Sequence, residues 1–324
     1  MKPLQIAACL DGRPGHEKQT QGVIAALTRL TPVAATYTKL PRPTVATGLK
    51  NWIVYLGTLG LRTWQPTGSK AVDLIVGTGA ATHIPMLRLK GRSHAKIVTC
   101  MTPDPLLVGK IDLCLVPHHD QPPQRANIFT TIGPPGLPAR TRRSDSQRNL
   151  ILVGGRDEKS HAWQTASLLA QIKTLVAREP DLTWTITSSP RTPGECEIRL
   201  QALADGYPQV TFFRAQDTAK GWIEGAYAQN GTAWVTADSI SMIYEALTAG
   251  CRVGVLPVQW KKPHNKFQKS IDYLERRHMV MIYEYWLTNP GQSFQPAALD
   301  EASRCAEEIL RRWWPDRLNG WIIP

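Results

Sequence analysis

The loop after the first apolar run carries the side chains best suited to acid–base chemistry. It reads Leu-Asp-Gly-Arg-Pro-Gly-His-Glu, with Asp11, Arg13 and His16 just before a helical pattern. A neutral histidine is the usual proton acceptor near pH 7, and backbone amides at a helix start, here around Gly15, hold anions. The loop therefore predicts a catalytic site with His16 or Asp11 as the base. The alternative is a plain turn in which Glu17 favours the helix dipole.

Two further segments of the first half resemble ligand-binding loops only in part. Gly77-Thr78-Gly79 joins a strand to a helix but lacks the third glycine of the dinucleotide fingerprint. Asp104 follows the next strand, where a ribose-binding acid would stand, but a tight turn lining a cleft is favoured over a nicotinamide site. His119 belongs to a His-His-Asp run with the composition of metal ligands. Because adjacent residues of an extended chain point to opposite faces, we expect hydrogen-bonded loop residues and no metal.

Two loops of the second half have the composition of a phosphate-binding site. An apolar run ends in Gly154, Gly155 and Arg156, which together offer close backbone approach, amide donors and positive charge. Ser188 and Arg191 leave the next strand and could bind a phosphate or a nucleoside. Either segment could instead be an ordinary glycine or serine–proline turn.

The most informative segment reads Thr-Ala-Asp-Ser-Ile-Ser-Met-Ile-Tyr-Glu-Ala and runs from a strand into a helix. Asp238, Ser239 and Ser241 lie in the first turn, where the helix dipole favours an anion. Glu245 follows Ser241 by four residues, on the same helix face, within reach of a ribose diol. Lys266 follows the next strand and adds charge at the same rim. The alternative is a helix capped by Asp238 or Ser239.

These loops must be positioned by strands, because short apolar runs alternate with helical patterns along the whole chain. Most runs are apolar without strict alternation, as in parallel strands covered on both faces, so we expect an α/β fold. The runs are residues 4–10, 72–76, 96–101, 111–116, 149–153, 183–187, 210–213, 233–236, 252–257 and 279–282, and the helical patterns include residues 17–30, 162–178, 241–249 and 296–312.

A linker is predicted near the middle of the chain, at residues 133–138 and the polar run 140–148. It divides the 324 residues into two domains, 1–138 and 139–324. The expected arrangement is two Rossmann-like domains facing a central cleft, with ligands at the carboxyl ends of the strands. The final helix is expected either to stay with the second domain or to cross back to the first.

Composition narrows the class of partner. Lys and Arg exceed Asp and Glu by 38 to 26, a net charge of +12, which favours an anionic partner. The basic residues are scattered without an aromatic–basic recognition motif, so nucleic acid is disfavoured. Six cysteines without a Cys-x-x-Cys pair indicate buried, reduced thiols. Neither a signal peptide nor a membrane span is evident, but residues 49–64 form either an interfacial membrane segment or a buried helix.

The motifs together resemble the Elm-type mitochondrial fission family in its bacterial branch. The similar segments are DGRPGH, MTPDP, VPHHD, LVGG, TSSPRTP and, most specifically, TADSISMIYEALTAG. Their order and spacing fit from about residue 4 to residue 267. The resemblance implies a GT-B-like fold and a sugar-nucleotide enzyme of cell-envelope biosynthesis, such as lipopolysaccharide assembly. In that fold family a Glu near a helix start holds the nucleotide sugar, and Glu245 is the matching position.

The resulting hypothesis is a metal-independent glycosyltransferase that needs no cofactor besides its nucleotide-sugar co-substrate. The acceptor would be a cell-envelope glycan or a lipid-linked glycan, and the enzyme would be cytoplasmic or peripheral on an anionic membrane surface. The donor-binding residues would be Gly154, Gly155, Arg156, Ser188, Arg191, Asp238, Ser239, Ser241, Met242, Glu245 and Lys266, and the acceptor-side residues Arg13, Gly15, Gly77, Gly79, Asp104 and His119. Two alternatives remain, a nucleotide-sugar epimerase on the same fold and a non-catalytic membrane-associated adaptor.

Overall fold

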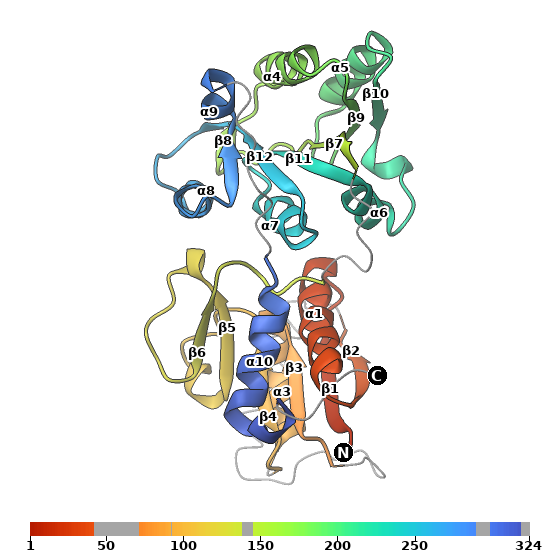
Figure 1. Ribbon diagram of the computed structural model, residues 1–324. Helices are drawn as coiled ribbons and strands as arrows, with labels where there is room; N and C mark the ends of the chain where they lie inside the picture. The colour runs from red at the N-terminus through yellow and green to blue at the C-terminus, as the bar shows by residue number, and fades with distance from the viewer. Residues whose placement is uncertain (42–70, 92, 138–144, 290–298, 319–324) are drawn as a thin grey trace. The chain divides into compact units, whose positions relative to one another are not determined.

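The computed structural model describes residues 1–41, 71–91, 93–137, 145–289 and 299–318, which form two compact units. Unit 1 comprises residues 1–138 and 300–324, and unit 2 comprises residues 139–299. The last helix, α10 (Glu301–Trp313), therefore belongs to unit 1, although it follows the whole of unit 2 in the chain. Figure 1 shows both units, each built on a sheet of its own.

Unit 1 is built on a parallel six-stranded sheet in the order β2-β1-β3-β4-β5-β6. Its strands are β1 (Leu4–Leu10), β2 (Val33–Lys39), β3 (Leu74–Gly77), β4 (Lys96–Thr99), β5 (Leu113–Pro117) and β6 (Ile128–Thr131). Among the residues that the structure describes in this unit, two longer helices besides α10 pack on the sheet, α1 (Pro14–Leu30) and α3 (Ala80–Lys90).

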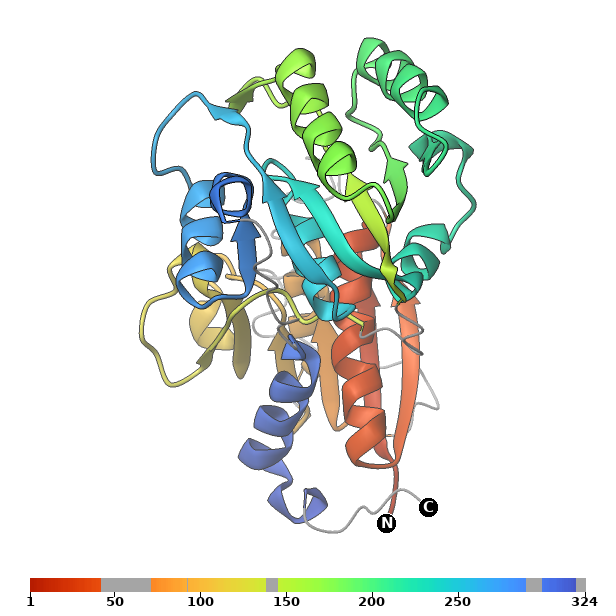
Figure 2. The same cartoon turned by 45° about the horizontal axis from the view of Figure 1, so that its top comes forward.

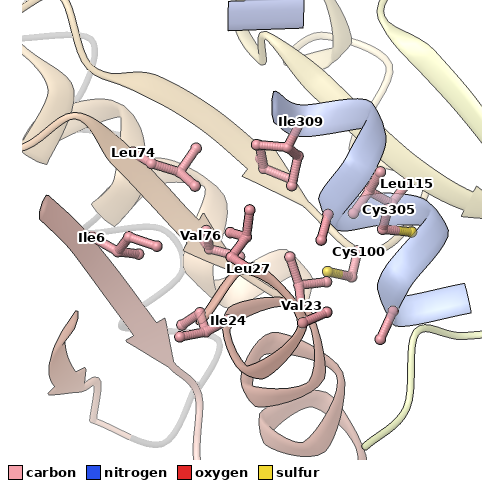
Figure 3. Close-up of a cluster of buried hydrophobic side chains, with 14 of the residues drawn as sticks. Ile6, Val23, Ile24, Leu27, Leu74, Val76, Cys100, Leu115, Cys305 and Ile309 are labelled. Atoms are coloured by element: carbon pink, nitrogen blue, oxygen red, sulfur yellow. The ribbon is translucent and has the colours of Figure 1, made fainter. Parts of the chain in front are cut away.

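Alternating side chains of this sheet face two separate cores. One face packs against α1 and α10, and Figure 3 shows Ile6 and Leu74 of the sheet beside Leu27 of α1 and Ile309 of α10. The opposite face packs against α3 around Met86. Because both faces are covered, the strands are apolar at successive positions, as the sequence pattern indicated.

Unit 2 has a second parallel six-stranded sheet, in the order β10-β9-β7-β11-β12-β14. Its strands are β7 (Asp145–Leu152), β9 (Thr183–Thr187), β10 (Val210–Phe213), β11 (Asn230–Thr236), β12 (Arg252–Leu256) and β14 (Val280–Ile282). A short antiparallel pair, β8 (His161–Ala162) and β13 (Gln259–Trp260), joins the loops after β7 and β12.

Helices cover both faces of this second sheet, as the two views of Figures 1 and 2 show. One side carries α4 (Thr165–Arg178), α5 (Gly194–Asp205) and α9 (Tyr283–Thr288), and the other carries α6 (Trp222–Gln229), α7 (Ile240–Thr248) and α8 (Lys266–Arg276). The cluster around Trp184 and Trp234 fills the space under α4, α5 and α9.

The predicted fold class is confirmed, and each of the ten apolar runs overlaps a strand. The edge strands β2 and β6 were not predicted. Each pairs with one neighbouring strand only, and few of the side chains of β2 and β6 are buried, so their sequences lack a continuous apolar run. Residues 145–148 were assigned to a linker but begin β7. Helix α4 starts at Thr165, three residues later than predicted, because β8 takes residues 161 and 162. Residues 49–64, expected as either an interfacial segment or a buried helix, lie outside the described residues.

All six cysteines are buried and none is in a disulfide, as expected. Burial raises the pKa of Cys9, Cys100 and Cys114 to about 12, so these thiols stay protonated near neutral pH. No helix in the described part of the chain is long and apolar enough to cross a bilayer.

Candidate functional site

The strand order creates a topological switch point in each sheet. In unit 1, β1 and β3 are neighbours. From β1 the chain continues to β2 on one side of this pair, and from β3 it continues to β4 on the other side. In unit 2 the corresponding neighbours are β7 and β11. Open α/β sheets bind ligands outside the carboxyl ends of such strand pairs. Four of the polar loops singled out in the sequence, those with Asp11, Gly79, Gly154 and Asp238, follow these four strands.

At the switch point of unit 1, Asp11 and His16 form a paired carboxylate and imidazole. Asp11 directly follows β1, and its side chain is only 1% exposed. Its Oδ2 lies 2.7 Å from His16 Nδ1, and its Oδ1 accepts a hydrogen bond of 3.1 Å from the backbone N–H of Arg13. An ionised carboxylate only accepts, so it holds the proton on Nδ1 and leaves Nε2 as the basic nitrogen. The His16 side chain is 26% exposed.

A glycine lets the loop after β3 pack against this pair. Gly79 has a φ of +104°, and a Cβ there would lie closer than 3.0 Å to Asp11 Oδ2 and His16 Nδ1. Its backbone N–H donates to Met101 Sδ over 3.1 Å, so that amide is already occupied. Gly77 is also tightly packed, against Met86 and Thr82. The Gly-x-Gly segment is therefore a close turn that supports the pair.

The other acceptor-side candidates lie along the same unit, and of these the backbone N–H of Arg13 is hydrogen-bonded to Asp11. Arg13, just before α1, and Gly15, in the first turn of α1, are both exposed. Asp104 is exposed, and its Oδ1 accepts a 2.9 Å hydrogen bond from Leu106 N. His119 lies in a short 3-10 helix, His118–Asp120, with Nε2 3.8 Å from Asp120 Oδ1. The expected extended chain was wrong there, and no group of three or more His, Cys, Asp or Glu suited to a metal occurs among the described residues.

A buried histidine near this site makes unit 1 sensitive to acid. His83 of α3 is buried, with Nε2 3.2 Å from Thr99 Oγ1. Burial lowers its pKa to about 4, although the charge of Asp104 partly opposes the shift. An unfolded histidine titrates near 6.5, so between about pH 6.5 and pH 4 the unfolded chain binds more protons. The stability of the folded state therefore falls as the pH falls through this window.

The free energy of unfolding should fall less between about pH 7.5 and pH 5 in His83→Gln than in the unchanged protein, because this variant lacks the titrating group. The expected difference is about 2 kcal/mol. Denaturant titrations of both proteins at the two pH values measure the difference. Replacing the exposed His94 by Gln provides the control and should leave the pH dependence unchanged. If His83→Gln shows the same pH dependence as the unchanged protein, His83 does not stay neutral in the folded state.

At the switch point of unit 2, one carboxylate oxygen joins three segments. Asp238 follows β11, and its side chain is 1% exposed. Its Oδ2 accepts from Gly155 N at 3.1 Å, from Arg191 Nη2 at 3.0 Å and from Ser239 Oγ at 3.3 Å. The loops after β7, β9 and β11 are thereby tied together. The alternative of a helix capped by one of these side chains is wrong, because neither Asp238 nor Ser239 caps the first turn of α7 with its side chain.

The two glycines after β7 pack closely against neighbouring loops, and their amide hydrogens are bonded to side chains of the protein itself. Gly154 N donates to Thr236 Oγ1 over 2.8 Å, and Gly155 N donates to Asp238. A Cβ on Gly154 would lie closer than 3.0 Å to the Asp238 carboxylate, and a Cβ on Gly155 would overlap the backbone of Arg191. Larger residues at either position would push these loops apart.

The cation nearest this junction is Arg191, whose side chain is 46% exposed. Besides its bond to Asp238, it donates to Gly155 O and to Ser239 Oγ, each over 3.3 Å. Ser188 is buried and committed elsewhere, because it donates to Glu197 over 2.6 Å and accepts from Ala215 N over 2.9 Å. Arg156 is exposed beside the junction.

The remaining donor-side candidates lie on two helices. On α7, Ser241 is exposed, whereas Met242 and Glu245 are half-buried. Burial raises the pKa of Tyr227 on α6, and the negative charge of Glu245 raises it further. Lys266 is exposed at the start of α8, with Nζ 5.2 Å from the centre of the Phe267 ring.

Two threonines that organise the unit 2 switch point were missed as site residues. Thr236 accepts the Gly154 amide hydrogen, and Thr192 Oγ1 donates to the Gly154 carbonyl. Both lie next to residues that the sequence analysis named as donor-binding candidates, Thr192 directly after Arg191 and Thr236 two residues before Asp238. A threonine at the carboxyl end of a buried strand is a usable signal, because a hydroxyl there needs a hydrogen-bond partner.

Several solved structures are similar to this chain at low sequence identity. The UDP-GlcNAc 2-epimerase of Methanocaldococcus jannaschii matches with a TM-score of 0.55 at 11% identity, over 95% of this chain and 99% of that one. The S. aureus MnaA in a co-structure with UDP matches at 0.50 and 11%, over 98% and 90%. The E. coli heptosyltransferase WaaC with ADP matches at 0.47 and 8%, over 97% and 99%.

The two parallel six-stranded sheets with their helices are the GT-B fold, which glycosyltransferases and nucleotide-sugar epimerases share. No curated protein sequence matches the chain at a significant level. A family model described as mitochondrial fission ELM1 matches residues 14–313, nearly the whole chain. The chain therefore belongs to the mitochondrial fission ELM1 family.

Proposed function

We propose that this protein is a glycosyltransferase that moves a sugar from a nucleotide-sugar donor to a hydroxyl of a cell-envelope glycan or lipid-linked acceptor. The observation that carries the reaction class is the Asp11–His16 pair at the switch point of unit 1. A base held in one tautomer, on a side chain that is partly exposed, suits removal of a proton from an attacking hydroxyl. The Asp11 carboxylate also stabilises the imidazolium that this step creates.

In this proposal unit 2 binds the donor. Its switch point offers the exposed part of the Arg191 guanidinium and the start of α7, and both favour a diphosphate. Glu245 would accept hydrogen bonds from the ribose hydroxyls, as its placement in the second turn of α7 and its half-buried side chain allow. Stabilising the negative charge of the departing nucleoside diphosphate then falls to Arg191 and the α7 start.

The donor assignment is tested with a thermal-shift panel of nucleotide sugars and by calorimetry on the best ligand. A ligand at about 100 times its dissociation constant stabilises a protein by about 2.7 kcal/mol. We expect Glu245→Ala to remove this ligand-dependent shift while leaving the melting of the ligand-free protein close to normal. Glu275→Ala, an exposed carboxylate on α8, is the matched control and should bind normally.

Unchanged affinity in Glu245→Ala would remove Glu245 from the site. A panel in which no nucleotide sugar binds would reject the proposed function itself, in favour of a non-catalytic adaptor.

Epimerisation of a nucleotide sugar is the second candidate, because proton transfer by the Asp11–His16 pair would serve it as well. The two reactions differ in what they consume. A transferase releases the nucleoside diphosphate only when an acceptor is present, whereas an epimerase converts the nucleotide sugar without any acceptor. Following the sugar by NMR, with and without membrane glycan extracts, separates them.

A further inference from the structure

The hydrogen bonds at the unit 2 switch point occupy the amides of the glycine loop but leave the Arg191 side chain partly exposed. The backbone N–H groups of Gly154, Gly155 and Arg156 donate to Thr236, to Asp238 and to the Arg191 carbonyl. None of the three is available to a phosphate without breaking an internal bond. Arg191, in contrast, keeps nearly half of its side-chain surface exposed.

The direction of the Arg191 side chain is set by contacts around its guanidinium. Nη2 donates to Asp238 Oδ2 and to Ser239 Oγ, and Nη1 donates to the Gly155 carbonyl. The hydrogen bonds that Arg191 donates to described residues come from Nη1 and Nη2, and none comes from Nε–H. An exposed arginine normally loses much side-chain entropy when it binds a ligand. Here that entropy is already lost in the ligand-free protein, so the remaining donors are preorganised.

We propose that Asp238 is a positioning residue, which holds Arg191 at the start of α7 so that Arg191 binds the diphosphate of the donor. Asp238 itself does not touch the ligand, because its carboxylate is buried and would repel a phosphate. This inference rests on the proposed function and deepens it. It assigns the recognition of the anionic group to one arginine and reduces the glycine loop to the support beneath it.

The test is a double-mutant cycle on the full chain, with inorganic pyrophosphate as the probe and calorimetry as the measurement. Arg191→Ala should weaken pyrophosphate binding about tenfold or more, as expected for losing a charged hydrogen bond. Asp238→Asn, which removes the charge that orients Arg191, should also weaken binding. The double variant should bind no more weakly than Arg191→Ala, because Asp238 acts only through Arg191. Arg199→Ala, an exposed arginine on α5, is the control and should bind normally.

Three results would overturn the inference. Arg191→Ala could bind as the unchanged protein does. Asp238→Asn could tighten binding, which would make Asp238 a competitor of the ligand. Asp238→Asn could weaken binding further in the Arg191→Ala background, which would mean that it contacts the ligand.

If Asp238→Asn does not fold, Arg191→Lys decides, since lysine keeps the charge but lacks the planar fork that makes these contacts. Wild-type affinity in Arg191→Lys would show that the orientation does not matter, and a loss close to that of Arg191→Ala supports the inference.

Pyrophosphate separates this inference from the proposed function. Arg191-dependent binding of pyrophosphate, with no tighter binding of any nucleotide sugar, would sustain the anion site and reject the donor. Tight binding of a nucleotide sugar that Arg191→Ala does not weaken would support the proposed function and reject the role of Arg191 in binding the diphosphate.

Discussion

Replacing His16 by alanine is expected to lower kcat by about 10²–10⁴-fold, the usual contribution of a general base. The affinity for the donor should change little, because in the proposed mechanism His16 acts on the acceptor hydroxyl. Asp11→Asn should also lower kcat, since an amide neither fixes the Nδ1 proton nor stabilises the imidazolium as a carboxylate does. Initial rates of nucleoside diphosphate release, with calorimetry of donor binding, measure both quantities.

The matched control for this pair is Glu17→Gln, which removes a neighbouring charge in the first turn of α1. It should leave kcat within a few-fold of normal, because a first-turn carboxylate contributes only about 0.3–1 kcal/mol through the helix dipole. If His16→Ala and Asp11→Asn both keep the full rate, the loop after β1 is a structural turn and the base must be sought elsewhere. A large loss in donor affinity would instead place His16 in the donor site.

Ile309→Ala is expected to destabilise unit 1 by about 2–5 kcal/mol, the range observed for removing a large aliphatic side chain from a core. Ile309 is fully buried on α10, within the cluster that α10 shares with α1 and the sheet (Figure 3). The loss should be confined to unit 1, because α10 belongs to that unit. Hydrogen exchange of the whole chain can follow the two units separately.

We expect the amides of β1, β3 and α1 to exchange faster in Ile309→Ala, while those of β7, β11 and β12 keep their protection. Glu307→Ala, at an exposed position of the same helix, is the control and should change stability by no more than about 0.5 kcal/mol. Faster exchange in β7 and β11 as well would mean that the two units unfold together. Unchanged exchange in both units would contradict the packing of α10 on unit 1.

Much of the fold could be predicted from the sequence because buried parallel strands leave a local signal. Strands β4 and β12 are short apolar runs ended by polar or turn residues, and such runs are visible without any knowledge of their neighbours. Edge strand β2 has no such signal, since none of its residues is buried, and apolar and polar residues are mixed along it. Its assignment depends on pairing with β1, which is a long-range contact.

The candidate site could be predicted only as separate loops. Asp11 and His16 are five positions apart, so their pairing follows from a turn that leads into a helix and is locally encoded. The approach of Gly79 to that pair is not, because it depends on β3 being the neighbour of β1. The same holds for Asp238, whose partners Gly155 and Arg191 lie 83 and 47 positions away.

The sequence by itself determined the α/β class, the strands with a continuous apolar pattern and the polar loops at their carboxyl ends, because local composition and periodicity encode these. Only the tertiary structure decided which loops meet, that the Gly154 and Gly155 amides donate internally, and that α10 returns to unit 1. The physical reason is that strand order and helix docking are chosen by the total burial of apolar surface across the chain. No local pattern records which of several similar apolar faces will be the partner.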